Sequence, residues 1–541
     1  MHGVVARSFL GPLAERTQAR LSQFDTIDLG RRLAAADPTI WSNNSMVTGR
    51  IAQRLGWIRS PLDAPIRGVP AAAGRVMLLG MGGSSLGAAA CARAFGAAER
   101  LRVVDSTIPA AVRAVDTWLE EVTDVVVASK SGGTIETAVL ADYFEARCDG
   151  RVRFHAVTDP GSELEDRAAA HGYAACHLNA PDIGGRFSVL SHFGSVPLGL
   201  AGVEVGGIGM RAAAMAGRCA TPAAVENPGL WLGAVLAAAA ATGRDKILLQ
   251  AAPGLEGLAD WIEQLVAEST GKDGAGLVPV THAEPDGGVE LPADRTVVLL
   301  EWTSPADDEG RVEDWVRAGV PVVRLALREP HDIGAEFYRW QVAVAAVGVA
   351  LGINPFDEPD VASAKRRTGE MLRATEDEGR LPRPVPDWSG DRVQLFASGM
   401  VGRGGTEILT NIVEPTASGY LGLLAFLPSD PTVEAALDRL REVVGGPNPV
   451  TLGWGPRYLH SSGQLHKGGQ PTGRFLMLTA DDAEDVEIPG RPWTLGTLAR
   501  AQALGDAFAL EEVGRTVVRA HLSGSLEPAI AELVSLLKQA R

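Results

Sequence analysis

Residues 75–87 read R-V-M-L-L-G-M-G-G-S-S-L-G, an apolar run that passes into a loop of glycine and serine. An apolar run of this length is typical of a buried strand, and the alanine-rich stretch after it predicts a helix. Glycines let backbone N–H groups approach an anion closely, and the beginning of a helix favours negative charge. The segment therefore predicts a strand–loop–helix unit that can hold an anionic group.

Short apolar runs and amphipathic stretches keep alternating beyond this segment. The runs that predict strands lie at 75–79, 101–104, 125–128, 152–157, 247–250, 297–301 and 322–327. The stretches that predict helices include 86–95, 110–121 and 336–351. Continuous apolar strands separated by helices indicate parallel sheets that are buried on both faces. We therefore predict an α/β fold with two doubly wound parallel-sheet domains.

The C-terminal part of the chain predicts a smaller α/β domain of its own. Its strand candidates lie at 421–427, 475–478 and 517–521, and a charged, proline-rich stretch at 373–390 precedes it. The predicted domains are a helical and linker segment at 1–70, a first sheet domain at 71–225, a second at 226–372 and the C-terminal domain at 391–541.

Composition limits the partners of this chain of 541 residues. Its formal net charge is −16, which argues against nucleic acid or an anionic membrane as a partner because either needs a broad basic surface. The apolar runs are shorter than the roughly 18 residues of a membrane span. Its 4 cysteines show no metal-ligand spacing, so we expect reduced thiols, no metal site and a cytoplasmic protein.

A second loop at 129–137, S-K-S-G-G-T-I-E-T, also follows an apolar strand and opens a helix. In a doubly wound sheet both loops emerge at the same edge. The hydroxyls of Ser129, Ser131 and Thr134 can donate hydrogen bonds to phosphate oxygens. The alternative is a polar turn in which Thr134 merely caps the helix.

Two further segments supply groups for chemistry: I-G-G-R-F-S at 183–188 and Q-L-V-A-E-S-T-G-K at 264–272. Arg186 is flanked by glycine and can stabilise charge that develops in a transition state, unless it only pairs with a surface carboxylate such as Asp182. Gln264 and Glu268 share one helix face. The negative end of the helix dipole is expected to raise the proton affinity of Glu268, which suits a general base. The alternative is an ordinary glutamate on the solvated face of the helix.

Together these segments resemble the glucose-6-phosphate isomerase family, whose domains belong to the sugar isomerase (SIS) superfamily. The motifs, including N-P-F-D-E-P-D-V-A-S-A-K at 354–365, occur in that family's order from about residue 70 to 365. The resemblance implies two SIS domains and an active site between them that a second subunit completes, hence a homodimer. It implies acid–base chemistry with no metal and no organic cofactor.

The resemblance also assigns roles to individual residues. Glu268 would move a proton between C1 and C2, Arg186 would stabilise the cis-enediolate, and Lys365 would aid ring opening near the ring oxygen. Gln264 would contact the sugar. The residues implied to bind the phosphate and its surroundings are Gly83, Ser84, Ser129, Lys130, Ser131 and Thr134.

Two positions depart from the family pattern. Glu358 stands in the substrate-binding motif where many members of the family have glutamine, which adds a negative charge. The family's ring-opening histidine has no clear counterpart; His282 is the nearest candidate by position and His331 a weaker second. A lone histidine in a loop is also often structural.

The stretch at 452–469, L-G-W-G-P-R-Y-L-H-S-S-G-Q-L-H-K-G-G, resembles the tail of bacterial proteins that fuse transaldolase to glucose-6-phosphate isomerase. The transaldolase half is not in this sequence, which suggests a functional link to a separate transaldolase. His460, His466 and Lys467 form either a basic loop that binds an anion or closes over the isomerase site, or an ordered loop between domains.

We therefore expect an aldose–ketose isomerase that interconverts glucose 6-phosphate and fructose 6-phosphate. An isomerase that also accepts mannose 6-phosphate is one alternative, because the difference lies in the pocket around C2. A non-catalytic sugar-phosphate sensor is another. A sensor would need neither Arg186 nor Glu268, and both are retained in matching contexts.

Overall fold

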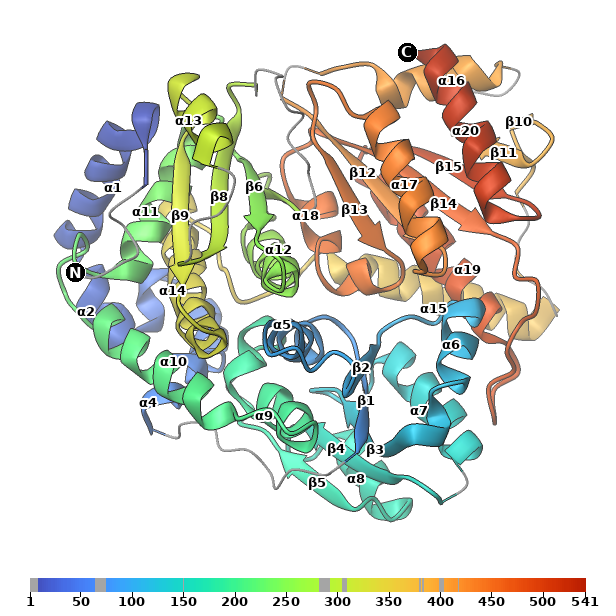
Figure 1. The fold of residues 1–541 in the computed structure, drawn as a ribbon, viewed down its shortest axis with the longest axis horizontal. Coiled ribbons are helices and arrows are strands. Elements are labelled where there is room, and N and C mark those ends of the chain that lie inside the picture. Colours follow the sequence, from blue (N-terminus) through green and yellow to red (C-terminus); the bar gives the residue numbers. More distant parts are fainter. Residues whose placement is uncertain are drawn as a thin grey trace. The chain divides into compact units, whose positions relative to one another are not determined.

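The computed structural model describes residues 8–63, 74–148, 150–281, 292–303, 309–378, 381, 384–397, 403–416 and 418–541 (Figure 1). The chain forms two compact units. The first comprises residues 1–105, 121–141 and 148–357, and the second comprises residues 106–120, 142–147 and 358–541. Among the described helices, none combines the length and apolar character needed to cross a membrane.

The first sheet of the first unit is parallel throughout and has the strand order β2-β1-β3-β4-β5. Its strands are β1 (Arg75–Gly80), β2 (Leu101–Val104), β3 (Val122–Ala128), β4 (Arg153–Thr158) and β5 (Ala175–Leu178). The strand order reverses between β1 and β3, because β2 lies on one side of β1 and the later strands lie on the other. In open parallel sheets, ligands bind at the carboxyl ends of the strands where the order reverses. Gly80 and Ala128 lie opposite each other at those ends.

The second sheet of the first unit has the order β7-β6-β8-β9 and is also parallel. Its strands are β6 (Lys246–Ala251), β7 (Val278–Val280), β8 (Arg295–Trp302) and β9 (Val322–Leu327). The first four strands of each sheet therefore follow the same order, which confirms the predicted α/β class. The helices after the two first strands, α5 (Leu86–Ala94) and α12 (Glu256–Thr270), pack on each other, and Gly257 allows close contact with Ala90.

Two helices, α11 (Pro228–Ala241) and α14 (Ile333–Leu351), are apolar around most of their circumference and largely buried. A helix that is hydrophobic all round belongs in a core. Their contact is close, because a Cβ atom at Gly233 would lie 2.8 Å from the Ala343 carbonyl oxygen and from the Ala346 Cβ atom.

The remaining helices of the first unit surround these elements. They are α1 (Ala14–Thr26), α2 (Leu29–Ala34), α3 (Ser45–Ala52), α4 (Ser60–Asp63), α8 (Glu163–Ala170), α9 (His192–Leu200), α10 (Val205–Cys219) and α13 (Glu309–Arg317), with α7 (Ile135–Cys148) divided between the two units.

The second unit contains the C-terminal sheet, with the order β10-β11-β15-β14-β12-β13. Its strands are β10 (Trp388–Ser389), β11 (Val393–Phe396), β12 (Tyr420–Phe426), β13 (Val450–Trp454), β14 (Gly473–Ala480) and β15 (Thr516–Leu522). The strands from β12 to β15 pair in parallel, whereas β11 pairs antiparallel with both of its neighbours. This sheet has a hydrophobic core separate from that of the first unit.

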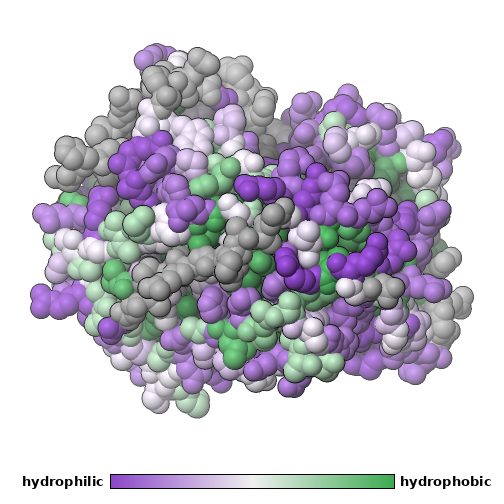
Figure 2. All heavy atoms as spheres, turned by 60° about the horizontal axis from the view of Figure 1, so that its bottom comes forward, coloured by the Kyte–Doolittle hydropathy of each residue, from purple (hydrophilic) through white to green (hydrophobic). Residues whose placement is uncertain are grey.

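The helices of the second unit are α6 (Pro109–Asp116), α15 (Val361–Glu378), α16 (Gly405–Val413), α17 (Pro431–Val444), α18 (Gly463–Gly468), α19 (Leu495–Glu512) and α20 (Leu526–Ala540). Because α15 packs on α19, it belongs to this unit. The four domain limits derived from the sequence stay predictions. On the face shown in Figure 2, hydrophilic residues cover much of the coloured surface and hydrophobic residues gather in smaller areas between them.

Gly233→Ala should destabilise the protein by about 1–3 kcal/mol, because the added methyl group overpacks the contact between α11 and α14. Gly217→Ala on the exposed face of α10 is the matched control. A Cβ atom there meets no atom within 4 Å, so we expect a gain of about 0.4–1 kcal/mol. Urea unfolding of both variants would check this, and equal midpoints would contradict it.

Candidate active site

The glycine–serine loop after β1 is held in a fixed conformation. It begins a short 3₁₀ helix, η4 (Gly82–Ser84), at whose first residue φ is +54°. Side chains other than glycine rarely adopt that conformation. The Ser84 hydroxyl donates a hydrogen bond of 2.8 Å to the Met81 carbonyl oxygen. The loop thus presents its serine from the edge of the sheet where β1 and β3 end.

The hydroxyl-rich loop after β3 is organised by its own side chains. The buried Ser129 hydroxyl donates to the Thr134 hydroxyl at 3.1 Å and accepts from the Gly132 N–H at 3.2 Å. The Ser131 hydroxyl accepts from the Gly133 N–H at 3.3 Å. Because β1 and β3 are neighbours, the two loops lie side by side, as the sequence predicts. Hydroxyls and glycine N–H groups at such an edge suit a phosphate.

Lys130, in the middle of the second loop, contacts a carboxylate. Its ammonium group pairs with Asp159 and donates to the Pro181 carbonyl oxygen at 2.8 Å. The charge of this lysine is therefore already balanced within the structure. Its predicted contact with substrate stays a prediction.

Gly83 brings the arginine segment against the first loop. A Cβ atom on Gly83 would lie 2.2 Å from the Gly185 carbonyl oxygen and 2.6 Å from the Arg186 backbone nitrogen, so only glycine fits here. The Ser188 hydroxyl donates to the Gly83 carbonyl oxygen at 3.2 Å. These contacts hold the 3₁₀ helix η6 (Gly185–Leu190) beside η4. Packing against Gly185 and Arg186 therefore already requires glycine at position 83. The role of Gly83 in substrate binding stays a prediction.

Arg186 is buried, and its guanidinium group reaches several oxygen atoms. Nε donates to the Ser269 hydroxyl at 2.9 Å, and Nη2 donates to the carbonyl oxygens of Pro355 at 2.7 Å and Asp357 at 3.0 Å. Nη1 lies 3.4 Å from Oε1 of Glu268. This environment differs from the alternative considered from the sequence, in which Arg186 pairs with a surface carboxylate such as Asp182.

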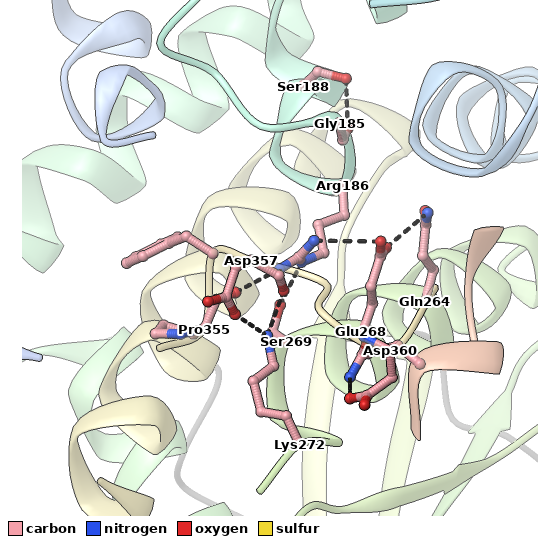
Figure 3. A network of polar contacts seen from close by, with 12 residues as sticks. Gly185, Arg186, Ser188, Gln264, Glu268, Ser269, Lys272, Pro355, Asp357 and Asp360 are labelled. Carbon is pink, nitrogen blue, oxygen red and sulfur yellow. Dashed lines mark hydrogen bonds and ion pairs between the residues drawn. The ribbon is translucent and has the colours of Figure 1, made fainter. Parts of the chain in front are cut away.

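Glu268 lies between a guanidinium group and an amide, as Figure 3 shows. It occupies the last turn of α12, and only 9% of its surface is exposed. Gln264, one turn earlier on the same helix face, donates from Nε2 to Oε2 of Glu268 at 3.3 Å. The structure thus joins Arg186 of one predicted motif to Gln264 and Glu268 of another. A buried, oriented carboxylate of this kind suits a general base.

Lys272 is a charged residue beside this site that the sequence analysis did not single out. Its side chain is 2% exposed, and Nζ donates to the carbonyl and, at 3.0 Å, to the carboxylate of Asp357. Arg186 donates to the same Asp357 carbonyl (Figure 3). Burial and the nearby charge of Arg186 lower the pKa of Lys272 to about 8. Its place four residues after Glu268, on the far side of Gly271, was the signal that could have revealed it.

The remaining candidate residues from the sequence do not belong to this buried group of polar contacts in the structure as described. His282 lies outside the described residues. His331, in the 3₁₀ helix η7 (Pro330–Asp332), lies 3.3 Å from the Glu204 carboxylate. Glu358 and Lys365 belong to the second unit, where both are exposed. Within the described ranges, no group of three or more histidine, cysteine or acidic side chains could hold a metal ion.

Comparison with known proteins identifies several relatives, although no family model matches the chain. Glucose-6-phosphate isomerase of Symbiobacterium thermophilum is 30% identical over 396 residues, covering 60% of this chain and 88% of that protein. A probable glucose-6-phosphate isomerase of Natronomonas pharaonis is 32% identical, covering 55% of this chain and 78% of that protein. The crystal structure of a hypothetical protein from Thermus thermophilus aligns with a TM-score of 0.56 at 22% identity, over 69% of this chain and 100% of that one. This structural match supports the fold alone.

Because of Lys272, the free energy of unfolding should rise with pH between about 8, the pKa of this lysine in the folded protein, and 10.5, its ordinary pKa. In that range the unfolded chain binds more protons at this lysine than the folded chain does, so a rise in pH favours folding. Lys272→Met should remove this contribution, whereas Lys538→Met, at an exposed lysine, should keep it. Urea unfolding at a series of pH values measures how the free energy of unfolding depends on pH. The prediction is contradicted if this dependence has the same slope in wild type and in Lys272→Met.

Proposed function

The chain belongs to the glucose-6-phosphate isomerase family, and we propose that it interconverts glucose 6-phosphate and fructose 6-phosphate. One observation carries this proposal: Glu268 is buried with its two carboxylate oxygens next to the Gln264 amide and the Arg186 guanidinium group. An aldose–ketose isomerase has to remove a proton from one carbon and return it to the next. A single oriented carboxylate can do both.

We propose that the two loops after β1 and β3 bind the phosphate group. Ser84, Ser129, Ser131 and Thr134 would donate from their hydroxyls, together with glycine N–H groups of the same loops. The net charge of −16 opposes an anionic substrate, so local donors have to supply the affinity. The junction of a strand with the beginning of a helix provides such donors, as in both of these loops.

In the proposed proton transfer, Glu268 takes the proton from C2 of the aldose and delivers it to C1 of the same intermediate. Negative charge then develops on the oxygen atoms of an enediolate. Arg186 is already fixed by Ser269 and by two backbone carbonyl oxygens, so its charge needs no reorganisation when that negative charge appears. Gln264 would orient Glu268 and contact the sugar.

Ring opening requires a further acid or base near the ring oxygen. We propose Lys365 for this step and His282 as the accompanying histidine, both from the family resemblance. Glu358 would lie near the substrate, where its negative charge would modify affinity. Acid–base groups of this kind need no metal or organic cofactor for the reaction.

We make three further proposals about the protein. The family resemblance supports a homodimer, the scattered cysteines support a cytoplasmic location, and the likeness of residues 452–469 to the fusion proteins supports a functional link to a separate transaldolase. The likeness of residues 452–469 to the tail of the fusion proteins stays a prediction.

A coupled assay tests the proposed function directly. Purified protein is given fructose 6-phosphate, and glucose 6-phosphate is followed through its dehydrogenase, with and without a metal chelator. We expect turnover that the chelator does not change. Calorimetric binding of fructose 6-phosphate without any turnover would contradict the enzyme and indicate a sugar-phosphate sensor.

Glu268→Gln should lower kcat by about 10²–10⁴-fold, because the amide cannot accept the proton. Binding of fructose 6-phosphate should stay nearly unchanged, since the proposed phosphate donors lie in the two loops. Glu256→Gln, in the first turn of the same helix, is the control and should keep its activity. Steady-state kinetics and calorimetry measure both effects. A kcat within a few-fold of wild type would remove Glu268 from the mechanism.

A further inference from the structure

The turn at residues 354–357 supplies two of the oxygen atoms that surround Arg186. The carbonyl oxygens of Pro355 and Asp357 accept from Nη2 of Arg186 at 2.7 Å and 3.0 Å. The turn follows the end of α14 and belongs to the first unit, as Arg186 does. The position of the guanidinium group therefore depends on where this turn lies.

The 354–357 turn is shaped by its own side chains and by packing. Oδ1 of Asn354 accepts from the Phe356 N–H at 3.1 Å, and Nδ2 donates to the Asp357 carboxylate at 2.8 Å. An asparagine that bonds the backbone two residues on stabilises a turn. The buried Phe356 ring packs against Trp41 and Phe187, with ring centroids 4.8 Å and 5.4 Å apart. The carbonyl oxygens of the turn are thereby held in fixed directions.

Lys272 holds the last residue of this turn, as Figure 3 shows. Its Nζ atom donates to the Asp357 carbonyl oxygen and lies 3.0 Å from the Asp357 carboxylate. The same carbonyl oxygen accepts from Arg186. Burial of Lys272 disfavours its charge and lowers its pKa to about 8. Such perturbed groups gather at functional sites, and this one contacts an atom that Arg186 also uses.

Arg186 lies farther from Glu268 than a close ion pair requires. Nη1 and Oε1 are 3.4 Å apart, whereas charge-assisted hydrogen bonds of this kind measure about 2.7–2.9 Å. Opposite charges attract each other strongly where water is excluded. The contacts that oppose this attraction are those to oxygen atoms of Ser269, Pro355 and Asp357, at 2.7–3.0 Å.

We infer that Lys272 is a positioning residue for Arg186. By fixing Asp357, it keeps the guanidinium group on the 354–357 turn and away from the Glu268 carboxylate. This inference rests on the proposed function, in which Glu268 is the base and Arg186 stabilises the enediolate. A guanidinium group that closed on Glu268 would make the carboxylate less basic and would itself be misplaced. A misplacement of about 1 Å can cost about 10²-fold in rate.

Lys272→Met tests this inference, because methionine has neither the charge nor the hydrogen-bond donor. We expect kcat with fructose 6-phosphate to fall about 10-fold or more, and KM to change less than about 3-fold. The proposed phosphate donors lie in other loops. Lys538→Met, at an exposed lysine of α20, is the matched control and should behave as wild type. An unchanged kcat, or a change confined to KM, would overturn the inference.

Asn354→Ala separates positioning from the loss of a positive charge. This variant removes two hydrogen bonds of the turn and leaves Lys272 and Asp357 in place. Because Asn354 is only half-buried, the variant should fold. We expect kcat to fall about 3-fold or more, with KM again little changed. A wild-type kcat in Asn354→Ala would mean that Lys272 acts through its charge alone, and would overturn the inference.

A double-mutant cycle links Lys272 to the group that it positions. In an Arg186→Ala background, Lys272→Met should lower kcat further by less than about 2-fold, because the guanidinium group is already gone. The same fold loss in both backgrounds would overturn the inference.

The Nε–H group of Arg186 distinguishes failure of this inference from failure of the proposed function. Nitrogen-15 NMR of arginine side chains detects it, and Arg186→Lys assigns the signal. Because this group donates to the buried Ser269 hydroxyl, its exchange with water should be slow in wild type and about 10-fold faster or more in Lys272→Met. Unchanged exchange would overturn the positioning role, whether or not the protein is an isomerase. Absence of turnover in wild type would instead refute the proposed function, on which the catalytic part of the inference rests.

Discussion

Glu268 and Arg186 are buried next to each other, and each charge offsets the cost of burying the other. The pair can form only where the last turn of α12 meets η6. That meeting depends in turn on Gly83, whose missing side chain leaves room for the backbone at Gly185. The glycine–serine loop after β1, the arginine and the carboxylate are consequently fixed to one another within a single unit. Lys272 and Asp357 extend the same arrangement, since Asp357 accepts from both cations.

The three sheets share an order of parallel strands but differ in the chemistry of their loops. In the first sheet, hydroxyls and glycines follow β1 and β3. In the C-terminal sheet the order β13-β12-β14-β15 repeats, yet the loop after β14 carries Asp481, Asp482 and Asp485. Burial raises the pKa of Asp482 to about 6. A loop of carboxylates repels phosphate, so the shared topology does not imply a shared ligand.

Much of the fold and of the candidate site could be predicted because local patterns encode them. The apolar runs predicted the parallel strands, and the order of motifs led to Arg186, Gln264 and Glu268, which the structure brings together. Lys272 was missed because its burial depends on Asp357, 85 residues later in the chain. The hydrogen bonds between Gln464 and Asp360 span 104 residues and were missed for the same reason. No periodicity reports a contact of that separation.

By itself the sequence determined the strand–loop–helix units, the hydroxyl content of the second loop and the place of Glu268 at the end of a helix. These features depend on the preferences of neighbouring residues, which a pattern records directly. Only the tertiary structure decided which oxygen atoms surround Arg186, that Gly83 must lack a side chain, and that His466 and Lys467 are buried. Each of these depends on packing between elements far apart in the chain, where space and desolvation select the partner.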